Sequence, residues 1–211
     1  TLMRCRFVDN HSDWEGGAIA CDDDAAPTLV ECVVSNNTAD GHGGGMVCAG
    51  TATVAVYACV FSGNSALDDG GGIAAFAPIE VADTLFELNE TITFGGGVAA
   101  FFPASFSECT FARNHAGTLG FGFGGGVSGG GSFARCTFDG NTAEVEGGAV
   151  YGGGQFGGCT LHGNGAPLAG GISGGGTADN TIIAFGTLGE AVVGAMTLTC
   201  SDVHANAGGP G

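Results

Sequence analysis

The stretch Cys5-Arg6-Phe7-Val8-Asp9-Asn10 decides the fold, because its pattern returns along the rest of the chain. A Cys, an apolar residue two positions later and an Asn five positions later recur, with Thr replacing Cys in one copy. A repeat of this kind is typical of a solenoid, in which each unit forms one coil that packs on its neighbours. The seven segments are residues 5–10, 32–37, 59–64, 84–89, 109–114, 136–141 and 159–164, and weaker copies follow at 181–183 and 201–206.

A glycine cluster precedes a second short apolar segment in each unit, as in residues 16–21 and 43–48. The apolar positions of these segments alternate, which indicates strands, and no stretch has the longer period of a helix. Units of 20–27 residues are too short for propeller blades and fit one coil of a β-helix. The sequence therefore predicts an all-β, right-handed parallel β-helix of about 8–9 coils, forming a single domain over residues 1–211.

Stacking the units in register produces columns of like residues. An apolar column should fill the core, and an Asn column should end a strand where the chain turns, because Asn tolerates left-handed backbone angles. We expect the cysteines to be buried, reduced thiols. The apolar column is Phe7, Val34, Phe61, Phe86, Phe111, Phe138 and Leu161. The Asn ladder is Asn10, Asn37, Asn64, Asn89, Asn114, Asn141 and Asn164. The Cys ladder is Cys5, Cys32, Cys59, Cys109, Cys136 and Cys159.

The charge balance limits the partners. The chain has 21 acidic residues, four arginines and no lysine, with a net charge of -17. Nucleic acid and anionic membrane surfaces both require clustered cations, so neither is expected to bind. No apolar run is long enough to span a membrane, and we expect no membrane insertion of this segment.

These residues resemble the right-handed parallel β-helix repeats of bacterial secreted and surface proteins, whose coils read C-x-F-x-x-N-x-A-x-x-G-G. They are also similar to the repeats of polymorphic outer-membrane proteins and autotransporter passengers, with G-G-A-I and F-x-x-N elements. The resemblance covers nearly the whole chain. It implies a module of a longer exported protein, located outside the cell or on its surface. It does not imply an activity, because this scaffold carries adhesins, structural proteins and enzymes alike.

Acidic residues follow the Asn in the first three units: Asp13, Glu15, Asp40, Asp68 and Asp69. If their oxygens converge they could bind Ca²⁺, and the alternative is a solvated face.

In the middle units the same loop turns apolar, at Phe94, Phe121 and Phe123. Exposed, these side chains would form a partner surface; the alternative is a loop that folds over them.

The enzyme alternative depends on two short elements. Gly41-His42-Gly43 and Asp68-Asp69-Gly70 resemble parts of a polygalacturonase site, but they occur in the reverse order and fall inside the repeat. The five histidines are expected at surface or turn positions.

Two functions stay open: a non-catalytic structural or adhesive module, and a carbohydrate-active lyase or hydrolase. The expected partners are other copies of the chain, the rest of a longer rod, or a cell-surface polysaccharide or protein.

Overall fold

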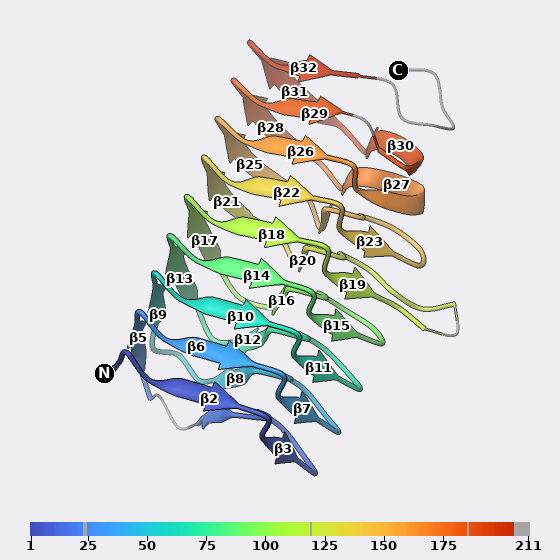
Figure 1. Cartoon of the computed structure of the whole chain (residues 1–211). Coiled ribbons are helices and arrows are strands. Elements are labelled where there is room, and N and C mark those ends of the chain that lie inside the picture. The colour runs from blue at the N-terminus through green and yellow to red at the C-terminus, as the bar shows by residue number, and fades with distance from the viewer. Residues whose placement is uncertain (23–24, 119, 185, 205–211) are drawn as a thin grey trace.

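The chain winds into a parallel β-solenoid. The computed structural model describes residues 1–22, 25–118, 120–184 and 186–204, within which every regular element is a strand (Figure 1). In Figure 1 the nearest strands run from left to right while the chain climbs from the N-terminus to the C-terminus, which is right-handed winding. The predicted right-handed parallel β-helix is confirmed. Within these ranges there is also no helix that could cross a membrane. Asn206, in the last weak copy, lies outside the described residues.

Sheet A contains one strand from each of nine coils, all parallel and stacked in chain order. Its inward residues pair directly from coil to coil, as Val81 pairs with Phe106 and Phe106 with Phe133. The strands are β1 (Leu2–Met3), β5 (Thr28–Val30), β9 (Val54–Tyr57), β13 (Ile79–Ala82), β17 (Ala104–Ser107), β21 (Gly131–Ala134), β25 (Gly154–Gly157), β28 (Gly176–Asp179) and β31 (Met196–Thr199).

Sheet B follows sheet A after a two-residue corner and also has nine parallel strands. The corner residue takes a left-handed backbone conformation, as at Ala58 with φ 52°. The strands are β2 (Arg6–Val8), β6 (Val33–Ser35), β10 (Val60–Ser62), β14 (Leu85–Glu87), β18 (Thr110–Ala112), β22 (Thr137–Asp139), β26 (Thr160–His162), β29 (Ile182–Ala184) and β32 (Asp202–Val203).

Sheet C holds two columns of strands that merge in the long strand β27 (Gly165–Ser173), which β30 (Leu188–Val193) also joins. The first column directly follows the Asn positions: β3 (His11–Ser12), β7 (Thr38–Ala39), β11 (Ser65–Ala66), β15 (Glu90–Thr91), β19 (His115–Ala116) and β23 (Thr142–Ala143). The second follows the glycine clusters: β4 (Ile19–Cys21), β8 (Met46–Ala49), β12 (Ile73–Phe76), β16 (Val98–Ala100), β20 (Val127–Ser128) and β24 (Val150–Tyr151).

Stacked aromatic rings fill the middle of the core. Phe111 of sheet B lies fully buried between Phe86 and Phe138, with ring centroids 5.0 and 4.8 Å away. Phe106 of sheet A meets Phe111 edge-on at 5.5 Å, so the two aromatic columns interlock. Burying an apolar side chain of this size contributes roughly 1.5–3 kcal/mol.

The glycine clusters occupy positions where the backbone requires glycine, as the repeat predicts. Gly70 has φ +68°, a conformation that L side chains rarely adopt. A Cβ on Gly71 would fall on the carbonyl oxygens of Glu90 and Gly96 in the next coil. The backbones of adjacent coils therefore approach closely here only because no side chain separates them.

Candidate functional site

The seven Asn side chains lie on one corner of the solenoid and bond from coil to coil. Asn89 Nδ2 donates to Asn114 Oδ1 at 2.9 Å and to the carbonyl of Phe61 at 2.9 Å. The backbone N–H of Asn89 also donates to Asn114 Oδ1, at 3.0 Å. The same bonds recur from Asn37 to Asn141, and these side chains are fully buried. The amides thus satisfy the polar groups of a corner that water does not reach.

The cysteines of the Cys ladder all have free thiols. The five from Cys32 to Cys159 are buried, while Cys5 in the first coil is partly exposed. Each of these five thiols lies within hydrogen-bonding distance of a backbone carbonyl oxygen, as the Cys59 thiol does with that of Tyr57 at 3.2 Å. Burial raises the pKa of the Cys59 thiol to about 11, so it is protonated at neutral pH. A second in-register pair, Cys21 and Cys48, lies on β4 and β8.

Thiol titration of the native chain should divide the nine cysteines into distinct classes. Cys200 is exposed and should react at once, and Cys5 and Cys21 are intermediate. Six thiols are buried and should react only after denaturant is added, because the reagent cannot reach them in the folded chain. The measurement is 5,5′-dithiobis(2-nitrobenzoate) release with and without guanidinium. Rapid reaction of all nine without denaturant would contradict the buried positions.

Four of the five predicted acidic residues, all but Asp69, line a cavity of about 280 Å³ on the outside of the solenoid. Asp13 follows β3 and Asp40 follows β7, and the adjoining residues Ser12 and Ala39 pair in register. In the third coil Leu67 takes the equivalent place after β11. The cavity is lined by Asp13, Trp14, Glu15, Asp40, Gly41, His42 and Asp68. The carboxylates therefore lie in one region. Carboxylates at directly adjacent positions of neighbouring coils repel each other.

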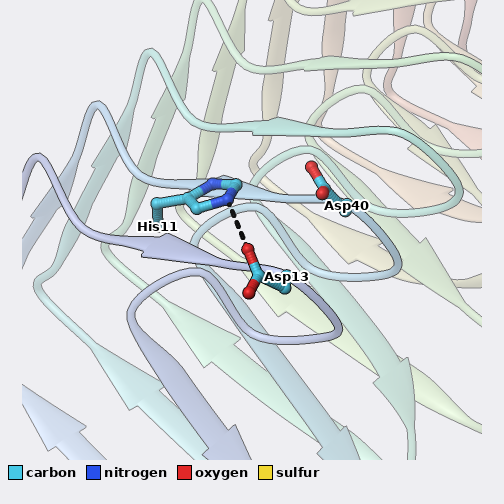
Figure 2. Close-up of side chains that lie close together, drawn as sticks. All are labelled: His11, Asp13 and Asp40. Atoms are coloured by element: carbon cyan, nitrogen blue, oxygen red, sulfur yellow. Dashed lines mark hydrogen bonds and ion pairs between the residues drawn. The ribbon is translucent and has the colours of Figure 1, made fainter.

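The imidazole of His11 lies close to two of these carboxylates. His11 Nε2 lies 3.1 Å from Asp13 Oδ1, and one ligand atom each from His11, Asp13 and Asp40 lie within 4.8 Å of one another (Figure 2). His11 Nδ1 hydrogen-bonds Thr38 Oγ1 at 2.8 Å, which orients the ring. We expected His11 at a surface or turn position; it is exposed on β3, and its place beside Asp13 and Asp40 shows only when adjacent coils are aligned.

A second histidine meets another of the predicted acids. His42 Nδ1 lies 3.1 Å from Asp69 Oδ2, an ion-pair distance without the geometry of a directed hydrogen bond. The side chains are 27% and 13% exposed, respectively. The Gly-His-Gly and Asp-Asp elements, which the repeat alone explains in the sequence, are thus neighbours in space.

The three phenylalanines of the expected partner surface differ in exposure. Phe121 is 65% exposed, while Phe94 and Phe123 are half-buried and stack at 5.2 Å. Tyr151 of β24 packs on Phe123 at 4.9 Å, a contact that the loop sequence does not reveal. Leu119, in the same loop, lies outside the described residues.

A separate aromatic ladder, made of His42, Phe76 and Phe101, runs across three successive coils. Phe76 and Phe101 stack with parallel rings 4.7 Å apart, and His42 meets Phe76 edge-on at 5.1 Å. Phe101 is 47% exposed and its neighbour Phe102 is 49% exposed. The ladder begins at the acidic cavity, since His42 belongs to both.

The fold and these columns define a parallel β-solenoid whose coils repeat one Cys-Phe-Asn-Gly-Gly pattern. Residues 58–75 and 135–153 each match the Chlamydia polymorphic membrane protein repeat. The first match runs through β10, β11 and most of β12, and the second through β22, β23 and β24. The chain is therefore a β-solenoid, two segments of which are similar to the polymorphic membrane protein repeat. No curated protein and no solved structure matches it.

Proposed function

We propose that this chain is a non-catalytic structural and adhesive module of an exported bacterial protein, displayed at the cell surface. The two polymorphic membrane protein repeats support a surface-associated membrane protein. The observation that carries the adhesive role is the aromatic ladder, because stacked rings half in solvent on a rigid scaffold form a ready binding platform.

The solenoid suits such a role because each coil packs on its neighbours, and one continuous core runs through all of them. Each coil bonds the next through sheets A, B and C and through the Asn ladder. A ligand that contacts several coils would therefore meet side chains held at a fixed spacing of about 4.8 Å. We propose a cell-surface polysaccharide or protein as the partner, with a second copy of the chain or the rest of a longer rod as the other candidates.

The test is binding of the purified chain to arrays of polysaccharides and extracellular-matrix proteins. A variant with Phe76→Ala and Phe101→Ala should bind at least about thirtyfold more weakly, since truncating an aromatic hot spot costs about 2 kcal/mol or more. Leu88→Ala is the matched control, because Leu88 is 56% exposed on a turn between sheets B and C. Equal loss in both variants, or no loss in the double variant, would contradict an adhesive ladder. Light scattering at several concentrations identifies a second copy as the partner.

A carbohydrate-active function is the second candidate, favoured by the contact between His42 and Asp69 beside the acidic cavity. Two carboxyl groups flanking a sugar bond are the usual requirement for glycoside hydrolysis. The test is release of reducing ends from polygalacturonate and related polymers. Release that Asp69→Asn abolishes would establish this function, and its absence across the polymers would favour the adhesive one.

A further inference from the structure

We propose that His11, Asp13 and Asp40 form a binding site for a divalent transition-metal ion such as Zn²⁺ or Co²⁺, which would link the first coil to the second. The residues come from two coils: His11 and Asp13 from β3 and the residue after it, and Asp40 from the residue after β7. Figure 2 shows the imidazole and the two carboxylates close together on the outside of the solenoid. This proposal is independent of the adhesive function.

The spacing of the donors suits a small ion. Ligands at about 2.0–2.2 Å from a tetrahedral zinc ion lie about 3.3–3.6 Å from one another. The donor atoms lie within 4.8 Å of one another, and rotation of the two exposed aspartate side chains can bring their oxygens closer to the imidazole. Within the described parts of the chain, no other His, Cys, Asp or Glu residues form a group of three at this spacing.

The imidazole is held as a metal-binding histidine usually is. Thr38 Oγ1 bonds Nδ1, so Nε2 faces Asp13 and is the nitrogen offered to an ion. A hydrogen bond on the second ring nitrogen is the usual way in which proteins orient a histidine ligand. Asp13 and Asp40 lie in neighbouring coils at the same position of the repeat, so an ion between them would remove their repulsion.

The donor set selects the class of ion. One imidazole nitrogen with two carboxylates suits Zn²⁺, Co²⁺ and similar ions, whereas Ca²⁺ prefers six or more oxygen ligands. The calcium expected from the acidic residues alone would not need His11. Dependence on His11 therefore distinguishes the two ions.

The fifth coil supplies a matched control. His115 occupies the same position of the repeat as His11, and its Nδ1 bonds Thr142 Oγ1 at the same 2.8 Å. Its Nε2, however, bonds the carbonyl of Gly117, and no carboxylate takes the place of Asp13. His115→Ala therefore removes an equivalent histidine and hydroxyl contact without touching the proposed ligands.

The experiment is a Co²⁺ titration of the full chain followed through Trp14 fluorescence. Trp14 is the one tryptophan, adjoins Asp13 and has 82% of its surface exposed, so a bound paramagnetic ion should quench it. Alkylating the accessible thiols first, and checking for a thiolate-to-cobalt absorption band, excludes binding by cysteine. We expect saturable quenching at one Co²⁺ ion per chain. Zn²⁺ should displace the bound Co²⁺, whereas Ca²⁺ at the same concentration should not.

His11→Ala and Asp40→Asn should each weaken Co²⁺ binding by about tenfold or more, while His115→Ala should bind as the unaltered chain does. Far-ultraviolet circular dichroism and the metal-free melting temperature check that each variant is folded. Unchanged affinity in His11→Ala, equal loss in His115→Ala, or displacement of Co²⁺ by Ca²⁺ would each overturn the proposal.

Discussion

Replacing Asn89 by Ala should lower the free energy of unfolding by about 2–6 kcal/mol, because two buried donors lose their acceptor and each costs about 1–3 kcal/mol. Asn89 Oδ1 accepts from the backbone N–H of Asn64 at 3.1 Å and from Asn64 Nδ2 at 2.9 Å. Both residues are fully buried, so water cannot replace the lost oxygen. Urea denaturation followed by circular dichroism measures the change.

Asn10→Ala is the matched control for the Asn ladder. Asn10 is exposed: its amide donates to Asn37 Oδ1 at 2.8 Å, and to the Val8 carbonyl at 3.3 Å in an exposed bond that water can replace. Losing it should cost only about 0.5–1.5 kcal/mol, the usual net value of one hydrogen bond. Equal effects at Asn10 and Asn89 would show that burial of the Asn ladder does not decide its contribution.

Replacing Phe111 by Ala should cost about 3–5 kcal/mol, the range found when a buried aromatic ring leaves a cavity. Phe111 contacts aromatic rings on three sides, from Phe86, Phe138 and Phe106, and none of its surface is exposed. Neighbouring coils fix the backbone on both sides, so the space cannot close by a simple shift. The midpoint of urea denaturation should fall accordingly.

Phe102→Ala provides the comparison for Phe111, since Phe102 is 49% exposed and follows the last strand of its coil in sheet C. A surface substitution of this kind should change the free energy of unfolding by no more than about 0.5 kcal/mol. A similar loss in both variants would place the Phe111 column outside the core.

The fold could be predicted from the sequence because each coil repeats the same chemistry at the same place. Phe61, Phe86 and Phe111 recur 25 residues apart, and they pair in this register in sheet B. The glycine clusters likewise mark the place where adjacent coils come closest. Repetition of this kind supplies long-range contacts that a single strand pattern cannot specify.

The candidate sites could be predicted only in part, because they depend on how different positions of neighbouring coils meet. The acids were identified by type, whereas His11 becomes a metal-ligand candidate only through its distance to Asp13 and Asp40. Likewise, Tyr151, which packs on Phe123, comes from strand β24 of the next coil rather than from the loop that holds Phe123. Side-chain directions on irregular loops carry no periodic signal, so the sequence leaves them open.

The most direct test of the central claim, a solenoid whose coils stack in register through the Asn ladder, is a ¹⁵N-edited nuclear Overhauser measurement on the Asn side-chain amides. The account predicts cross-peaks between the amides of Asn64, Asn89 and Asn114, which lie 25 residues apart and bond at 2.9 Å. It also predicts that these amide protons exchange slowly with solvent, while those of Asn10 exchange rapidly. Absence of the cross-peaks, with rapid exchange at every Asn, would contradict it.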